Sequence, residues 1–317
     1  MKIFFNYILQ YFKKDFNILS HVVIGIFLTV SLWFNYSFQF NGKKDFYHGI
    51  TETYNKQPQS VLYLLLLFGA AFLVSTAIVS FFSKQKVKPI FHSKFMLFGI
   101  IGMVFLALDC SYYLMQYTNG WFSENAFIER WGRACASNIS SLFTVIIPLY
   151  SIYFIVQYFK PEWYGLRLNG AKIKPYFWLI LFMLPLIYLA SLQPDFLESY
   201  PTYTDNYEYR FLETDQWITA GIYELCYGFD FLSVELFFRG FMVIALSRFV
   251  GKEAILPMVV VYCFLHFGKP AGEAVSSIFG GYILGILAYS SRNIYGGLIA
   301  HLGVAWGMEY MAYIQLN

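Results

Sequence analysis

The sequence predicts an all-α fold, a multi-pass transmembrane helix bundle with about eight to nine spans. Three observations lead to this fold class. Hydrophobic residues make up 58% of the 317 residues and charged residues only 13%, whereas soluble domains carry about a quarter charged residues. Aromatic residues reach 22%, which is typical of helices that face lipid and place Trp and Tyr at its interfaces. The apolar residues also gather in runs of the roughly 20 residues that cross a bilayer as a helix.

Nine apolar segments are candidates for membrane spans, and eight spans is the alternative count. The segment 217–248 is longer than one span needs, so we expect an interfacial or re-entrant start before the span itself. Lys2, Lys13 and Lys14 precede the first span without a small-residue cleavage site, so we interpret it as a retained helix rather than a signal peptide. The expected spans are approximately 20–38, 60–82, 95–116, 138–159, 175–194, 217–248, 253–268, 273–290 and 294–314.

The distribution of positive charges predicts the orientation of this integral membrane protein. With a cytoplasmic N-terminus, 14 Lys and Arg residues fall in cytoplasmic loops and seven in external loops, and Arg239 alone falls within a span. Cytoplasmic loops carry the excess of Lys and Arg in membrane proteins. We therefore expect a cytoplasmic N-terminus and an external C-terminus. The acidic loop 195–215 fits the external side.

Composition also argues against several kinds of partner and cofactor. The net charge is only +3, and no basic run is interleaved with aromatic residues, so we expect the lipid bilayer and no nucleic acid as a partner. Cys110, Cys135, Cys226 and Cys263 form no CxxC pair. They are interpreted as small buried residues rather than as a disulfide framework or a zinc site. No metal and no cofactor are expected.

The ionisable residues at membrane depth divide the chain into two predicted parts. Residues 1–174 hold four spans and one such acid, Asp109, and we interpret them as a packing or partner-binding module. Residues 175–317 are expected to form the functional core, because ionisable groups are costly within a membrane and usually mark function. The ionisable residues of this core are Glu224, Asp230, Glu235, Arg239, His266, His301 and Glu309.

Glu235 and Arg239 are the first elements of a candidate site. Their i, i+4 spacing places both side chains on one helix face, where they can form an ion pair. An unpaired Arg would be expensive in lipid. The pair has two interpretations, one as part of a functional site and one as an ion pair that only fixes helix packing. Gly240, which follows, would let another helix approach closely.

His266 and His301 are the second elements, each in an otherwise apolar stretch. A histidine can exchange protons with a carboxylate near neutral pH, which makes the two residues candidate catalytic groups. Each could equally be a helix-packing residue. A metal site that combines both histidines with Glu235 from three helices is a further alternative, although the sequence contains no HExxH motif.

The order and spacing of these residues resemble the CAAX-protease and bacteriocin-processing (CPBP) family of intramembrane proteases, which includes the Abi-type proteins. The family carries Glu-Glu-x-x-x-Arg, then Phe-x-x-x-His, then His-x-x-x-Asn or Asp on three separate helices. Here the corresponding segments begin at Val234-Glu235, Tyr262 and His301. The resemblance covers roughly residues 175–315 and implies a CAAX-protease-like core. Tyr262 in place of Phe is a conservative change.

The resemblance also implies roles for individual residues. The first Glu of the pair and the first His of the family activate a water molecule, and the second His with the Asn stabilises the oxyanion. Transferred to this chain, His266 would help to activate water, His301 would donate to the oxyanion, and Arg239 would hold Glu235. The activating carboxylate position is Val234 and the second oxyanion donor is Ala305. Asp230 is a possible substitute base because it lies one turn from Val234 on the same face, although a solvated Asp at a helix end is the interpretation that we favour.

Three functions follow from these observations. The first is a degenerate intramembrane protease, a pseudoenzyme that acts as a binding or assembly partner. The second is an active glutamic-type intramembrane endopeptidase that cleaves a membrane-associated peptide or protein. The third is a small-solute or proton-coupled transporter that uses the same charged residues as a relay. The resemblance implies a membrane protein, or a lipidated or peptide substrate, as the partner, and a bacterial inner membrane as the location.

Overall fold

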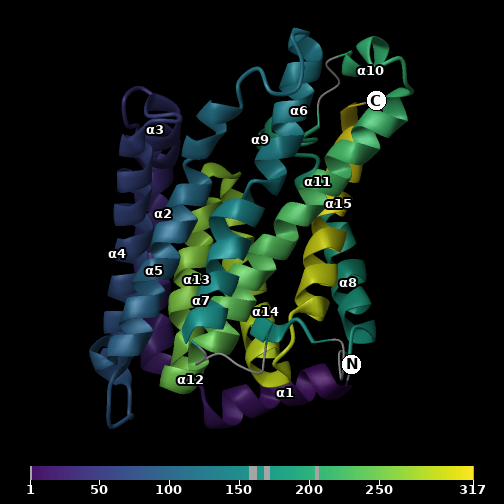
Figure 1. Ribbon diagram of the computed structural model, residues 1–317. Coiled ribbons are helices and arrows are strands. Elements are labelled where there is room, and N and C mark those ends of the chain that lie inside the picture. Colours follow the sequence, from purple (N-terminus) through teal and green to yellow (C-terminus); the bar gives the residue numbers. More distant parts are fainter. Residues whose placement is uncertain (1, 157–162, 168–171, 204–206, 317) are drawn as a thin grey trace.

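The computed structural model describes residues 2–156, 163–167, 172–203 and 207–316, and these residues form helices and loops without a β-strand. Long helices run side by side along one direction as a bundle (Figure 1). One short helix, α1 (Lys2–Lys14), instead lies across the lower end of the bundle in that view. The N-terminus lies at this lower end and the C-terminus at the upper end.

The first half of the chain forms long helices that are joined by shorter helical turns. After α1 its elements are α2 (Ile18–Ser37), α3 (Phe46–Thr53), α4 (Pro58–Phe82), η1 (Pro89–Phe91), α5 (Ser93–Cys110), η2 (Tyr113–Thr118), α6 (Ala126–Ile139), the π-helical η3 (Leu142–Ile146), α7 (Ile147–Val156) and η4 (Trp163–Gly165).

The second half contains the helices that carry the candidate site residues. Its elements are α8 (Lys174–Ala190), α9 (Pro194–Ser199), α10 (Glu208–Phe211), α11 (Gln216–Glu235), the π-helical η5 (Leu236–Ala245), α12 (Ser247–Val250), η6 (Gly251–Ala254), α13 (Ile255–Leu265), η7 (His266–Gly268), α14 (Ala271–Ser291) and α15 (Tyr295–Leu316).

The predicted all-α membrane bundle is confirmed, although the number of spans stays a prediction. Five helical stretches in the described part of the chain are long and apolar enough to cross a membrane, at Ile18–Ser37, Pro58–Phe82, Ser93–Thr118, Ala126–Val156 and Ala271–Ser291. The apolar helix Lys174–Ala190 is shorter. The other three predicted segments coincide with α11–η5, with η6–α13–η7 and with α15. Residues 157–159, at the end of the fourth predicted span, lie outside the described residues.

The structure differs from the sequence-based expectation in the segment 217–248. A re-entrant start is not observed, because α11 runs without a break from Gln216 and continues directly into η5; an interfacial start of this helix stays a prediction. Ten residues of η5 are π-helical, and all of them are buried. A π-helix of this length is rare and is commonly found at functional sites.

The core of the bundle is centred on α13. Every residue from Ile255 to Phe264 is buried, as expected for a helix that is apolar on all sides. Its neighbours include α4 and α2 from the first half of the chain and α14 from the second. One continuous cluster of buried side chains extends from Tyr11 to Ile294. Helices of both halves therefore share a single core.

Candidate functional site

Glu235 and Arg239 lie at the junction between α11 and η5, deep inside the bundle. Oε1 of Glu235 lies 3.1 Å from Nη1 of Arg239, and the two side chains are 0% and 1% exposed. The predicted ion pair between them is therefore confirmed. The Nη1 of Arg239 lies out of line for a good hydrogen bond, and Nε and Nη2 of the same guanidinium have no hydrogen-bond partner of standard geometry. The charge of Glu235 is thus the main compensation for this buried cation.

His301 brings α15 to the same carboxylate. Its Nδ1 lies 3.2 Å from Oε1 of Glu235, and its Nε2 lies 3.3 Å from the hydroxyl of Tyr262. A neutral imidazole with its proton on Nδ1 satisfies both contacts, because Nδ1–H donates to the carboxylate and Nε2 accepts from the hydroxyl. The ring of Phe231 packs edge-on against His301 at a centroid distance of 4.6 Å. His301 is therefore held in one orientation by three groups.

Tyr262 joins the two parts of the site. The Cζ of Arg239 lies 4.3 Å from the centre of its ring, within the range of a cation–π contact. The ring of His266 lies 4.5 Å from the same ring, in an edge-on arrangement. Sequence reasoning treated Tyr262 as equivalent to Phe and did not foresee that its hydroxyl contacts His301. A polar atom at membrane depth is the signal that could have indicated this contact.

His266 occupies the C-terminal end of α13 and is half-buried. Its Nδ1 lies 2.8 Å from the carbonyl oxygen of Tyr262, so Nδ1–H donates there and Nε2 keeps its lone pair. The structure thus brings His266, His301, Glu235 and Arg239 together around Tyr262. All four residues singled out from the sequence belong to one cluster.

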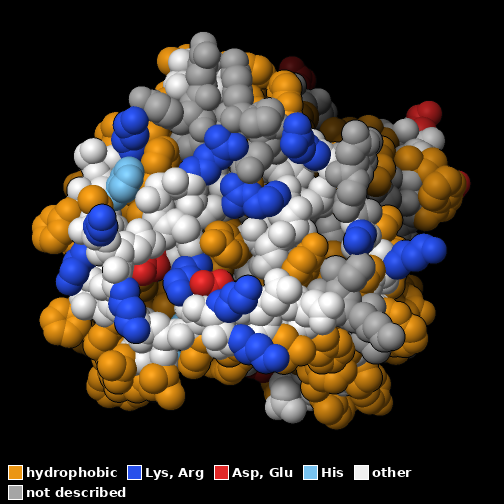
Figure 2. Space-filling view, turned by 90° about the horizontal axis from the view of Figure 1, so that it is seen from below, with side chains coloured by type: hydrophobic (Ala, Val, Ile, Leu, Met, Phe, Trp, Pro, Cys, Tyr) orange, Lys and Arg blue, Asp and Glu red, His pale blue; other side chains and the backbone are white. Residues whose placement is uncertain are grey.

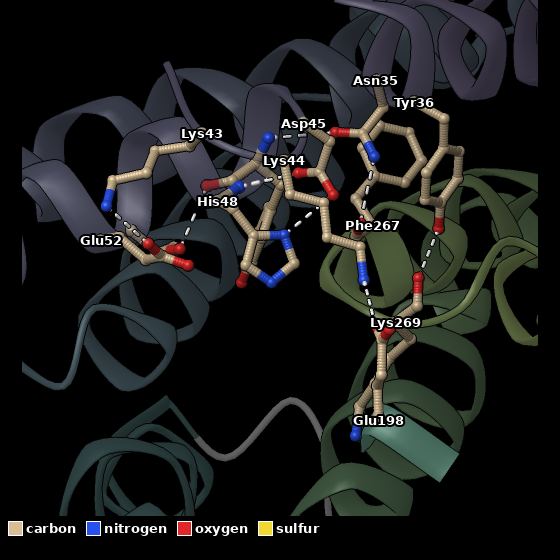
Figure 3. Close-up of polar contacts among 12 residues, drawn as sticks. Asn35, Tyr36, Lys43, Lys44, Asp45, His48, Glu52, Glu198, Phe267 and Lys269 are labelled. Carbon is tan, nitrogen blue, oxygen red and sulfur yellow. Dashed lines mark hydrogen bonds and ion pairs between the residues drawn. The ribbon is translucent and has the colours of Figure 1, made fainter. Parts of the chain in front are cut away.

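The turn that follows His266 is anchored by the N-terminal half of the chain (Figure 3). Nδ2 of the fully buried Asn35 donates to the carbonyl oxygen of Phe267 at 3.0 Å, and its Oδ1 accepts from the N–H of Tyr47 at 3.1 Å. The hydroxyl of Tyr36 donates to the carbonyl oxygen of Lys269 at 2.8 Å. These contacts from α2 fix the position of His266. Sequence reasoning found no role for Asn35, although a lone amide in an apolar span is a signal of such a contact.

Close approach of α15 to Glu235 depends on Gly297. A Cβ atom at this position would lie 2.4 Å from Oε2 of Glu235, well inside the contact distance of the two atoms. Gly240 has a similar function on the other side of η5, where a Cβ would lie 2.5 Å from the backbone oxygen of Tyr164. The predicted close helix approach at Gly240 is thus observed, although its neighbour is the short turn η4.

Two positions of the family pattern are aliphatic and lie beside the cluster. Val234 is half-buried, and Ala305 is 4% exposed. Neither side chain has an atom that can move a proton or donate a hydrogen bond. The carboxylate of Glu235 does not replace a carboxylate at position 234, because it is already shared between Arg239 and His301.

Asp230 does not have the environment that the sequence suggested. The favoured interpretation, a solvated Asp at a helix end, is wrong, because α11 extends from Gln216 to Glu235 and continues as η5. Asp230 is half-buried, and its Oδ1 accepts a hydrogen bond from Oγ of Ser233 at 3.1 Å. His301, on α15, and Asp109, on α5, lie in its neighbourhood.

Asp109 belongs to this second polar group, which sequence reasoning missed. Its Oδ1 accepts a hydrogen bond from Oγ1 of Thr144, on η3. Glu309, another acid of the predicted core, accepts two hydrogen bonds from the N–H of Thr202 at 3.0 and 2.8 Å and thereby holds a loop. Among the described residues, no group of three or more His, Cys, Asp or Glu side chains is arranged to hold a metal ion.

Comparison with known proteins agrees with this geometry. A family model described as type II CAAX prenyl endopeptidase Rce1-like matches residues 219–307. This range extends from α11 into α15 and includes Glu235, Arg239, His266 and His301. No curated protein and no solved structure matches the chain. The chain is therefore a helical protein with apolar helices long enough to cross a membrane, and its residues 219–307 are similar to the type II CAAX prenyl endopeptidase Rce1-like family.

Proposed function

We propose that this protein is a non-catalytic, CAAX-protease-like membrane protein that binds a membrane-associated peptide or protein segment. The observation that supports this proposal most directly is the state of Glu235. Its carboxylate is 0% exposed and lies 3.1 Å from Arg239 and 3.2 Å from His301. Both contacts are made by Oε1, whereas Oε2 is buried and has no hydrogen-bond partner. A carboxylate that is enclosed in this way stabilises the helix bundle, and its full burial keeps it from contact with a water molecule that it could activate.

The aliphatic residues beside the cluster support the same conclusion. Loss of a general base costs roughly 10²–10⁴-fold in rate, and loss of one oxyanion donor costs about 10²–10³-fold. Val234 and Ala305 stand at the positions that perform these functions in the family. The two losses need not multiply, because residues of one site act as a unit. Either loss alone would lower the rate at least about 10²-fold.

The binding role rests on the groups that remain partly accessible. Val234, His266 and His301 are all half-buried, whereas Glu235 and Arg239 are fully enclosed. A bound segment can therefore contact an apolar side chain and two imidazole rings. The buried ion pair beneath them would keep this surface in one arrangement.

The first test compares membrane-protein fragments in cells that express the native chain and in cells that express the His266→Ala/His301→Ala variant. We expect identical fragments by mass spectrometry, at equal abundance of the two folded proteins. A fragment that is present with the native chain and lost with the variant would overturn the non-catalytic assignment and would identify the substrate.

The second test addresses binding directly. A photoreactive diazirine side chain is placed at position 234, and a matched control places it at position 155, where Ile155 is 78% exposed on α7. We expect one discrete cross-linked protein or peptide from position 234 that is absent from position 155. Cross-links to lipid alone from both positions would contradict the proposed binding of a peptide segment.

A second candidate function, an active protease with a shifted base, is favoured by the place of Asp230. This carboxylate lies one helical turn from Val234 and near His301. If it activates water, the Asp230→Asn variant will lose a fragment that the native chain produces. The same comparison of fragments therefore distinguishes the two functions.

A further inference from the structure

The N-terminal helix α1 lies across the bundle, in contrast to the long helices that follow it. It spans 13 residues, from Lys2 to Lys14, which corresponds to about 20 Å and is too short to cross a bilayer. It lies across the lower end of the bundle and not along the spans (Figure 1). This places α1 at the level where the helices leave the membrane.

One face of α1 is apolar and exposed. Phe5 is 60%, Leu9 49% and Phe12 45% exposed, and Phe16, just beyond the helix, is 38% exposed. At 100° per residue the spacings of four and three residues place Phe5, Leu9 and Phe12 within about 60° of one another, and the ring of Phe16 lies 5.1 Å from that of Phe12. Removing apolar side chains of this size from water is favourable. The stripe Phe5–Leu9–Phe12–Phe16 is thus costly to expose to water and favourable to bury.

Contacts with the bundle prevent this stripe from turning inward. The ring of Phe4 packs edge-on against Tyr176 at 4.4 Å, and the ring of Tyr11 packs edge-on against Tyr282 at 5.9 Å. Tyr11 is only 4% exposed. These residues lie roughly 110–130° around the helix from the centre of the stripe. Within the stripe, the ring of Phe12 also lies 6.3 Å from that of Tyr282, and the ring of Phe16 lies 4.2 Å from that of His21. The helix is therefore clamped along one side, while the stripe side chains remain 38–60% exposed.

Positive charge lies near the stripe: Lys13 is about 70° around the helix from the centre of the stripe, and Lys14 follows it at the helix end, on the opposite side. Lys13 and Lys14 are exposed at the end of α1, and Figure 2 shows this end of the molecule with many Lys and Arg side chains and few acidic ones. Asp15 beside them is paired with Lys252 at 3.1 Å, and Glu253 accepts hydrogen bonds from Ser83. An apolar face flanked by lysines is typical of helices that lie in the plane of an anionic lipid surface.

We propose that α1 docks on anionic phospholipids of the leaflet at this end of the bundle. The stripe Phe5–Leu9–Phe12–Phe16 lies at the boundary between headgroups and acyl chains, and Lys13 and Lys14 contact lipid phosphates. Charge complementarity favours this occupant over a neutral protein surface. Through Phe4 and Tyr11, the docked helix braces α8 and α14, the helices to which Tyr176 and Tyr282 belong.

Fluorescence quenching tests the docking in vesicles that contain the full chain. A bimane label is attached to Phe5→Cys or Phe12→Cys, with Gln10→Cys as the matched control, because Gln10 is exposed on a different face of α1. The native chain, treated with the same label, gives the background fluorescence from its own four cysteines, which is subtracted. We expect brominated phospholipids to quench positions 5 and 12 and aqueous iodide to quench position 10. Iodide quenching of the stripe, or shielding of the stripe from both quenchers by a protein contact, would overturn the proposal.

The same label tests the preference for anionic lipid. At position 12 we expect stronger quenching by brominated phosphatidylglycerol than by brominated phosphatidylcholine. Replacing Lys13 and Lys14 by Gln should reduce this preference about fivefold per lysine, and high salt should also reduce it. The Lys43→Gln/Lys44→Gln variant makes the same charge change in the loop that follows α2 and should leave the preference unchanged. A preference that survives loss of Lys13 and Lys14 would contradict the anionic recognition.

Discussion

The guanidinium of Arg239 lies 4.3 Å from the centre of the Tyr262 ring, whose hydroxyl lies 3.3 Å from Nε2 of His301. One side chain thus contacts a cation through its face and an imidazole through its edge. Phenylalanine, the residue of the family pattern, would keep the first contact and lose the second. Tyr262 links three helices into one polar cluster for this reason.

Substitutions at Tyr262 should separate these two contacts. Tyr262→Phe removes only the hydrogen bond and should cost about 0.5–1.5 kcal/mol of unfolding free energy. Tyr262→Leu also removes the cation–π contact, which contributes up to about 2 kcal/mol when it is desolvated. Unfolding in mixed detergent micelles measures the loss of unfolding free energy in each variant. Equal losses for the two variants would show that the ring face does not stabilise Arg239.

Glu235→Gln should be among the most destabilising single substitutions in this chain. It leaves the guanidinium of Arg239 buried without a counter-charge, and breaking a buried pair in this way costs about 3–5 kcal/mol. The double variant Glu235→Leu/Arg239→Met removes both charges and should be milder than Glu235→Gln. Thermal unfolding of the purified variants checks the order. A double variant less stable than the single one would contradict the role of the pair as mutual compensation.

Gly297→Ala tests the contact between α15 and Glu235. The new methyl group would meet Oε2 of Glu235, which Arg239 and His301 hold in place, so a loss of about 1–3 kcal/mol is expected. Gly280→Ala is the matched control, because a Cβ there has no atom within 4 Å. Thermal unfolding should show a lower midpoint for the first variant and an unchanged or higher one for the second. Similar midpoints for both would show that α15 can move away from Glu235 without cost.

The loop helix α3 should give the protein a pH-dependent stability. Nδ1 of His48 lies 2.8 Å from Oδ2 of Asp45, and this hydrogen bond raises the pKa of His48 above its usual value of 6.5. A histidine whose pKa is raised on folding stabilises the protein fully below its unfolded pKa. This stabilisation is lost as the pH rises through the raised pKa of the folded state. Thermal midpoints should therefore fall as the pH rises above about 6.5.

The His48→Gln variant should lack this part of the pH dependence. Its midpoint should change less than that of the native chain over the same range. Asp45→Asn, which removes the partner of His48, should have a similar effect on the slope. If the thermal midpoints of both variants fall with pH as steeply as that of the native chain, the pH dependence belongs to other groups.

Restoring the family pattern should create proteolytic activity. The Val234→Glu/Ala305→Asn variant supplies a carboxylate and an amide beside His266 and His301. We expect new membrane-protein fragments in cells that express this variant, and their loss when His266→Ala is added. If the folded variant yields no new fragment, groups other than those at positions 234 and 305 are missing from the site.

Much of this architecture could be predicted from the sequence because it depends on strong local signals. Apolar runs predict spans in a bilayer, and charged groups within such runs, such as Glu235 and Arg239, must find partners there. The clustering of His266 and His301 with this pair followed only from the resemblance to a family. Spacing along the chain does not show which helices are neighbours.

The features that sequence reasoning missed depend on contacts between distant segments. Asn35 reaches the carbonyl of Phe267 across 232 positions of the chain, and nothing near Asn35 indicates its partner. The π-helix η5 was also missed, because its apolar residues suit any buried helix. Asp230 was misjudged because it was interpreted as lying at a helix end, whereas α11 runs past it to Glu235 and continues into η5. The orientation of α1 likewise depends on Tyr176 and Tyr282, far along the sequence.

The burial of α13 affects whether residues 219–307 can fold without the rest of the chain. Residues 219–307 contain this helix, but α4 and α2, which cover part of its surface, lie outside the matched range. If residues 175–317 were made alone, they would expose that surface of α13 to lipid and would lose the anchor of the turn after His266. Two separately expressed pieces, 1–174 and 175–317, should instead find each other in the membrane. The first half would then assist the folding of the second by covering the exposed surface of α13.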